Sequence, residues 1–284
     1  MDLTAQIVEA INTWLQTVSA QLLAPALPAA GQLLFTTPAF DQIQEVVQLW
    51  TIVRNTADAL FVLVVLAVGV LIMASGTFDS RYGAKVLVPR LLLATVVANA
   101  SLGITGGLIR LNNAIVTGAL GSEPTAAVGN QLAAMLGGHP ANVVVGFVVG
   151  LVAAGLALLL LALCIGRDLV LLIATVLSPL ALAAYALPQS EELARLWWRI
   201  YAALLFVQVV QAVLVVLGLE LLRHTDWLGG PVSDLTSGFL LVTLLYLLFR
   251  LPFAAYEWAF RQPLGQSAPV RTVLIAARAI APGA

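Results

Sequence analysis

Few side chains in this sequence could do catalytic or metal chemistry, and they are not grouped. The two histidines, His139 and His224, have no His, Cys or acidic partner at the spacing that a zinc site needs. Cys164 is the sole cysteine, so neither an intrachain disulfide nor a cysteine-based metal cluster can form. The sequence has no Gly-x-Ser-x-Gly elbow, no Gly-rich phosphate loop, and no pair of acids deep in an apolar run. We therefore expect no enzyme activity, no metal and no cofactor.

The remaining candidates are polar side chains inside long apolar runs. A polar group in hydrocarbon is costly, so it faces the interior of a helix bundle, a water path or another polar group. Asn99 lies deepest in its run, and Gln208 and Gln211 share one helix face. Their amides are interpreted either as bridges between helices or as pore-lining groups. The candidates at membrane depth are Arg90, Asn99, Gln208, Gln211, Glu220 and Arg250. The complete set of candidate structural or pore residues adds Ser101, Asn112, Asn113, Arg167, Asp168, Ser178 and Pro179.

The charged members of this set lie nearer to the ends of the apolar runs. Arg90 follows Pro89 at the entrance to a run and Glu220 lies near the end of another, so both are interpreted as headgroup anchors. Arg250 lies two residues before Pro252, which loosens its helix, and could pair with Glu257 or with Asp168.

Composition places these residues in a membrane protein. Of 284 residues 61% are apolar and only 10% are charged, far from the usual balance of a soluble domain. Because about 20 apolar residues suffice for one crossing, this surplus requires several crossings. The net charge of −1 excludes binding of nucleic acid through bulk charge.

Hydrophobic patterning divides the chain into an N-terminal part, a helical bundle and a tail. Residues 3–22 show the three- and four-residue spacing of an amphipathic helix, and the Ala- and Pro-rich residues 25–38 are typical of a linker. No cleavable signal peptide is expected, because the first basic residue is Arg54. The predicted parts are residues 1–37 (amphipathic helix and linker), 38–258 (transmembrane bundle with an exported loop at 110–141) and 259–284 (short tail).

Six apolar runs make up the predicted bundle. Thr37 and Pro38 are typical of an N-cap and first turn, and begin a helix that is expected to continue without a break to residue 76. In the fourth run, Ser178-Pro179 breaks the backbone hydrogen bonding, which predicts a broken or re-entrant element. The other runs cover residues 86–109, 143–165, 200–222 and 239–258, and the fourth covers 169–187.

Basic residues favour five full crossings plus a hairpin over six full crossings. With the Ser178-Pro179 run as a hairpin, nine basic residues lie on one side and three on the other, a usable positive-inside bias. The expected fold is an all-α polytopic bundle with its N-terminus and the 110–141 loop outside and its C-terminus in the cytoplasm. The nine are Arg81, Lys85, Arg90, Arg167, Arg195, Arg199, Arg261, Arg271 and Arg278, and the three are Arg54, Arg110 and Arg223.

Two stretches resemble the TrbL-like family, the polytopic inner-membrane subunits of type IV secretion and conjugal transfer systems. The first has Lys85, then Pro89-Arg90, then Asn99-Ala-Ser101, and ends with Asn112-Asn113. The second runs from Gly166-Arg167-Asp168 through Ser178-Pro179 to Trp197-Trp198. The resemblance covers residues 57–222. It departs from many members in its short loop at 110–141 and in its short tail.

The resemblance implies a non-enzymatic subunit of the bacterial inner membrane that forms a homo-oligomer and supports substrate translocation and pilus assembly. It implies contact with membrane lipid, a cytoplasmic secretion ATPase, a pilin and an inner-membrane scaffold, and links residues 110–141 to a translocated DNA or protein. The alternative is a secondary transporter or small-solute channel, suggested by the helix breaks at Pro179 and Pro252. A passive assembly scaffold or holin-like protein is a third interpretation.

Overall fold

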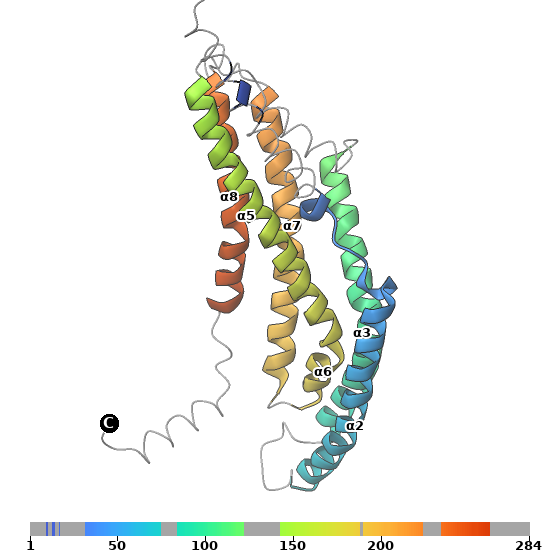
Figure 1. The fold of residues 1–284 in the computed structure, drawn as a ribbon. Helices are drawn as coiled ribbons and strands as arrows, with labels where there is room; N and C mark the ends of the chain where they lie inside the picture. The colour runs from blue at the N-terminus through green and yellow to red at the C-terminus, as the bar shows by residue number, and fades with distance from the viewer. Residues whose placement is uncertain are drawn as a thin grey trace, which may run out of the picture.

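The chain folds into long helices arranged side by side (Figure 1). The computed structural model describes residues 10, 13–14, 17, 32–74, 84–121, 143–187, 190–223 and 234–261. Within these ranges there is no strand, which confirms the all-α prediction. The long helices are α2 (Gln44–Ala74), α3 (Ala84–Leu120), α5 (Val143–Val176), α7 (Glu191–Arg223) and α8 (Asp234–Arg261), and the short ones are η1 (Phe40–Gln42), α6 (Ser178–Ala183) and η3 (Ala184–Ala186).

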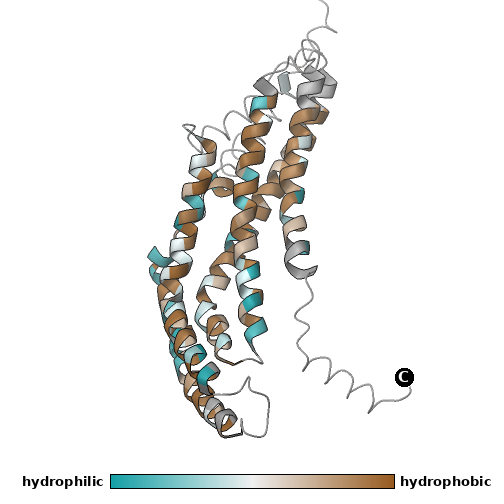
Figure 2. Ribbon diagram, turned by 180° about the vertical axis from the view of Figure 1, so that it is seen from behind, coloured by the Kyte–Doolittle hydropathy of each residue, from teal (hydrophilic) through white to brown (hydrophobic). Residues whose placement is uncertain are grey.

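Four of the long helices are long and apolar enough to cross a membrane. The crossing stretches are Gln44–Ala67, Leu87–Leu120, Val148–Val176 and Glu191–Leu221, and α8 contributes a shorter apolar stretch, Phe239–Ala255. Figure 2 shows that apolar residues dominate all five helices, and many of their large side chains are exposed. In a membrane these outward side chains contact lipid or neighbouring proteins. The exact number of crossings stays a prediction.

Helices α5 and α7 join at one end of the bundle through α6 and η3 (Figure 1). Helix α8 packs against α5 and α7, while α3 packs against α6 and α7, and α2 lies against α3. The largest core cluster includes Leu160 of α5, Val215 of α7 and Leu245 of α8. Leu34 and Phe35, in a helical turn at residues 32–35, belong to the same cluster, so part of the stretch expected to be a linker is packed in the core.

The first long helix begins later than its sequence suggests. Thr37 is not an N-cap, because residues 36–39 are not helical and Ile43 has extended backbone between η1 and α2. Thr37 is instead buried, since its side chain finds partners on other helices, and α2 begins at Gln44. The expected helix over residues 44–74 is confirmed.

The breaks between the following elements also differ from expectation. Helix α3 continues through Arg110 to Leu120, so the loop expected from residue 110 begins later. Helix α5 passes through Gly166-Arg167-Asp168 without interruption and ends at Val176. The expected break at Ser178-Pro179 is confirmed, with Leu177 between α5 and α6 and Pro179 in the first turn of α6. The predicted amphipathic helix and the C-terminal tail lie largely outside the described residues, as does the rest of the 110–141 loop.

Candidate functional site

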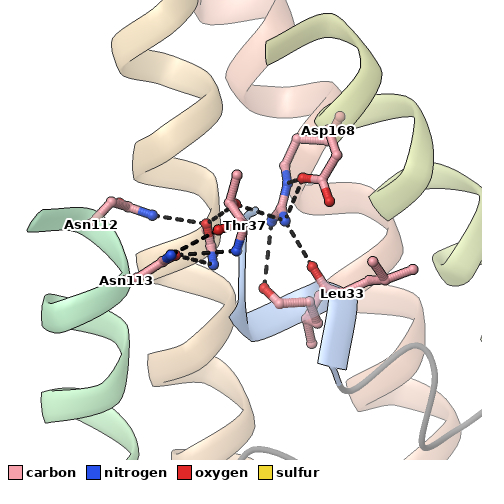
Figure 3. A network of polar contacts seen from close by, with 8 residues as sticks. Leu33, Thr37, Asn112, Asn113 and Asp168 are labelled. Carbon is pink, nitrogen blue, oxygen red and sulfur yellow. Dashed lines mark hydrogen bonds and ion pairs between the residues drawn. The ribbon is translucent and has the colours of Figure 1, made fainter. Parts of the chain in front are cut away.

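A polar network connects the N-terminal segment to three helices in the core (Figure 3). Its centre is Gln208 of α7, whose side chain is fully buried. The Gln208 Oε1 atom accepts hydrogen bonds from the Thr37 hydroxyl and from Asn112 Nδ2 of α3, each at 2.8 Å. One amide oxygen therefore holds α3 and the N-terminal segment against α7.

Asn113 binds the main chain of Thr37 rather than its side chain. The Thr37 N–H donates to Asn113 Oδ1 at 3.2 Å, and Asn113 Nδ2 donates to the Thr37 carbonyl at 2.8 Å. This pairing satisfies both backbone polar groups of Thr37, as a neighbouring strand would do. Asn113 thus holds the main chain at Thr37, while Gln208 holds its side chain (Figure 3).

Arg167 of α5 holds the other end of this segment. Its guanidinium is almost fully buried, and Nη2 donates to the Leu33 carbonyl at 2.8 Å. Longer contacts at 3.4 Å join Nη1 to the Leu34 carbonyl and Nη2 to the Thr37 hydroxyl. These carbonyls belong to the last turn of the helical residues 32–35, where a cation is favoured by the helix dipole.

Asp168 neutralises the buried guanidinium. Its Oδ1 atom accepts hydrogen bonds from Arg167 Nη2 at 3.0 Å and from Arg167 Nε at 3.2 Å. The Asp168 Oδ2 atom is buried and has no hydrogen-bond partner among the described residues. The pair explains why α5 can carry two charges in its interior without breaking, because a buried charge is tolerated when it is paired and hydrogen-bonded.

Pro179 and Pro252 each remove a helical hydrogen bond, and at both places a polar side chain supplies a donor instead. Pro179 cannot donate to the carbonyl of Thr175, four residues earlier, and the Ser178 hydroxyl donates to that oxygen at 2.7 Å. Pro252 lies inside α8 and cannot donate to the Leu248 carbonyl. Gln211 Nε2 of α7 donates to that oxygen at 3.1 Å. Ser178 and Gln211 therefore satisfy the backbone where it is broken.

The remaining candidates near α2 and α3 form separate contacts between helices. Arg90 is not only a headgroup anchor, since it forms an ion pair with Glu191 of α7 and lies over the Tyr185 ring, 4.7 Å from its centroid. Asn99 Nδ2 donates to Asp58 Oδ1 of α2 at 3.2 Å. Ser101 is buried, and its hydroxyl accepts a hydrogen bond from Trp50 Nε1 at 3.0 Å.

Arg250 and Glu220 lie apart from the network, and both are exposed. Arg250 Nη1 donates to the Tyr246 hydroxyl, one turn earlier in α8, at 3.3 Å. Asp168, one of the two partners considered for Arg250, is paired with Arg167. The structure thus brings together Asn112, Asn113, Arg167, Asp168 and Gln208, and leaves the other candidates at other helix contacts.

Sequence analysis missed two important members of these contacts. Thr37 was interpreted as a helix cap because Pro38 follows it, and nothing local distinguishes a cap from a buried threonine. Tyr201 of α7 is fully buried, and its hydroxyl lies 3.3 Å from Thr175 Oγ1 at the end of α5. A tyrosine in a continuous apolar run is a signal that could have found it, because a buried tyrosine hydroxyl needs a partner.

The arrangement holds chain segments together and shows no assembled donor set for a metal ion. Among the residues that the structure describes, no three His, Cys, Asp or Glu side chains converge. His139 and His224 lie outside those residues. The chemistry of the network is hydrogen bonding and charge pairing, which fixes one packing of α3, α5, α7 and the N-terminal segment.

Comparison with known proteins identifies the family. No curated protein and no solved structure matches the chain. A family model described as TrbL/VirB6 plasmid conjugal transfer like protein matches residues 1–284, and its members are not a known enzyme family. Together with the long apolar helices, this match indicates an integral inner-membrane protein. The chain therefore belongs to the TrbL/VirB6 family of plasmid conjugal transfer-like proteins, as the resemblance in its sequence predicted.

Proposed function

We propose that the chain is a structural subunit of the inner-membrane complex of a conjugative type IV secretion system. Copies of it oligomerise, and the assembly supports substrate translocation and pilus assembly. The observation that carries this proposal is the match of the TrbL/VirB6 family model to residues 1–284. A cytoplasmic ATPase, a pilin and an inner-membrane scaffold are the proposed partners.

The buried network supports a structural role within each copy. Gln208 and Arg167 direct their polar groups at other segments of the same chain. These residues act as bridges between segments rather than as the lining of an open pore through one bundle. We therefore place the translocation path between copies.

The directions of the helices support the proposed topology. Helices α2, α3, α5, α7 and α8 alternate in direction, and α6 lies at the turn between α5 and α7 (Figure 1). Five crossings with α6 as a short hairpin put the two termini on opposite sides, and the positive-inside bias then puts the N-terminus outside and the C-terminus in the cytoplasm. Alkaline phosphatase fused at Ala284 should be inactive and a fluorescent protein fused there should be bright. The reverse pattern would contradict this topology.

A secondary transporter receives less support from the helix breaks. Transporters use broken helices because the freed backbone carbonyls bind ions or substrate. Here the Thr175 and Leu248 carbonyls already accept hydrogen bonds from Ser178 and Gln211. These two breaks are closed by the protein itself.

Deletion and complementation test the proposed function. Removing the gene from a conjugative plasmid should abolish transfer, and the wild-type gene in trans should restore it. The tagged chain, extracted in detergent, should purify as an oligomer together with a secretion ATPase or a pilin. Normal transfer by the deletion strain would refute the proposal.

A further inference from the structure

The outer face of α2 and α3 carries a polar cluster within two stretches that are long and apolar enough to cross a membrane. The cluster consists of Arg54, Asn55 and Asp58 of α2 and Asn99 of α3, and is called the α2–α3 polar face below. Asn55 and Asn99 are exposed, and the side chains of Arg54 and Asp58 are 35% and 42% exposed. Polar groups at membrane depth are expected to face protein or water rather than lipid.

Contacts within the chain hold this face in position. Asn99 Nδ2 donates to Asp58 Oδ1 at 3.2 Å, which joins α3 to α2. The guanidinium carbon of Arg54 lies 5.3 Å from the centroid of the Trp50 ring. Trp50 is in turn anchored by the hydrogen bond of its Nε1 atom to Ser101. The two charged side chains are therefore ordered on the surface.

The charges of this face are only partly satisfied within the chain. Arg54 and Asp58 form an ion pair one turn apart on α2, but its atoms Arg54 Nε and Asp58 Oδ2 are 3.9 Å apart, too far for a hydrogen bond. Arg54 Nη2 donates to Asn55 Oδ1 at 3.3 Å, whereas Arg54 Nε is buried and has no hydrogen-bond partner among the described residues. Because the ion pair is long and both side chains are partly exposed, the guanidinium and the carboxylate retain hydrogen-bonding capacity for an external partner of opposite charge.

The neighbouring surface of α3 leaves room for a helix. Gly103 and Gly107 follow Asn99 at four-residue spacing on the same face of α3. A Cβ atom added to either glycine would meet nothing within 4 Å. Small residues at this spacing allow close approach of another transmembrane helix, so the surface beside the charges is sterically open.

We propose that the α2–α3 polar face packs against the same face of a second copy of the chain. The proposal rests on the proposed function, in which copies assemble in the membrane. Copies inserted in the same direction and related by a two-fold axis along the membrane normal bring identical residues to the same depth. Asp58 of one copy then lies one turn, about 6 Å along the axis, from the level of Arg54 of the other, a distance that an arginine side chain can span. The α2–α3 polar face thus carries both the positive and the negative charge that such a contact needs, whereas lipid tails carry no charge.

Charge reversal in two differently tagged copies tests this contact. Arg54→Asp makes the face acidic and Asp58→Arg makes it basic. Either variant, expressed with itself under two tags, should lose co-purification of the tags at least fivefold. Expression of one variant with the other should restore it, because acid then faces base. Arg54→Lys keeps the charge and should co-purify as the wild type does.

A cross-linking measurement keeps the test independent of charge reversal, which can impair membrane insertion. Asn55→Cys should form disulfide-linked dimers in oxidised membranes. Leu158→Cys, at an exposed position on α5, is the matched control and should stay monomeric on the gel. Absence of the Asn55→Cys dimer, or equal dimer from both positions, would overturn the proposal.

The outcomes separate this surface from the proposed function. If every charge variant co-purifies with itself as strongly as the wild type does, the proposed contact surface is wrong, although the chain still forms an oligomer. If both variants lose co-purification and their co-expression does not restore it, the proposal is also wrong, because Arg54 and Asp58 then act within one chain. Loss of a secretion subunit, with self-association retained, assigns the face to that subunit and also overturns the proposal. A wild-type chain that purifies as a monomer refutes the oligomer in the proposed function.

Discussion

Gln211 of α7 donates a hydrogen bond to the Leu248 carbonyl of α8, the acceptor that Pro252 leaves without its helical donor. Gln211 is almost fully buried, so water cannot replace this bond. The contact links the two helices at the point where α8 is weakest. It also explains why a glutamine lies within an apolar run whose neighbours Ala212 and Val215 are core residues.

Gln211→Leu should destabilise the protein in a way that depends on Pro252. The substitution leaves the Leu248 carbonyl unpaired, whereas Pro252→Ala restores the backbone donor. We expect the loss in unfolding free energy to be larger by about 1 kcal/mol in the wild-type background than in the Pro252→Ala background. Thermal unfolding in detergent of all four proteins measures this coupling. Equal losses in both backgrounds would show that Gln211 does not serve the carbonyl.

Ser178→Ala should weaken the junction between α5 and α6. The Ser178 hydroxyl is the donor to the Thr175 carbonyl, and its removal leaves a buried acceptor unpaired at a cost of about 1–3 kcal/mol. Ser178→Thr retains the hydroxyl and serves as the control. A fall in the unfolding midpoint for alanine, but not for threonine, is the expected result. Similar midpoints for wild type and Ser178→Ala would contradict it.

Arg167→Leu should be more harmful than removal of the whole ion pair. The single substitution leaves the Asp168 carboxylate without its cation and the Leu33 carbonyl without its donor, which we expect to cost about 3–5 kcal/mol. The double variant Arg167→Leu/Asp168→Leu removes the uncompensated charge and should unfold at a higher temperature than the single variant. Circular dichroism on heating compares them. A double variant that is no more stable than Arg167→Leu would argue against the pairing.

Gly106→Ala should displace the carboxylate of Asp41, which lies in η1. A Cβ atom at Gly106 would lie 2.4 Å from Asp41 Cγ, and Asp41 forms an ion pair with Arg110, one turn further along α3. The carboxylate must move, so we expect a loss of about 1–3 kcal/mol. Gly118→Ala, also on α3, meets nothing within 4 Å and is the matched control, with unchanged or slightly raised stability. Equal unfolding midpoints for the two variants would refute the close contact.

The helices could be predicted from sequence because each contains a long apolar run, and few structures other than a membrane or core helix can bury such a run. The break at Ser178-Pro179 could also be predicted from local sequence, because a proline has no backbone N–H to donate in any context. Arg167 and Asp168 lie between two of the predicted runs, 143–165 and 169–187. Helix α5 nevertheless passes through them, because Arg167 finds carbonyls on a segment 134 residues away.

The assembly of the network could not be predicted for the same reason. Gln208 was recognised as a polar group that needs partners, and Asn112 and Asn113 were among the candidates, but the sequence does not show that Asn113 and Gln208 share Thr37 as a partner. Thr37 lies 76 residues from Asn113 and 171 from Gln208, and such pairings depend on tertiary packing that local periodicity does not contain. The domain boundaries and the role of the 110–141 loop stay predictions.

The sequence separation between Thr37 and Gln208 also determines how long the first residue waits for the second during synthesis. Gln208 leaves the ribosome 171 residues after Thr37, which at about 5–20 residues per second corresponds to roughly ten to thirty seconds. Throughout that interval the segment around Thr37 can pair with Asn113 of α3 but has no α7 to dock against, and Asn112 is inserted before its partner Gln208 exists. The bond between Thr37 and Gln208 therefore closes only after the earlier helices have already been made.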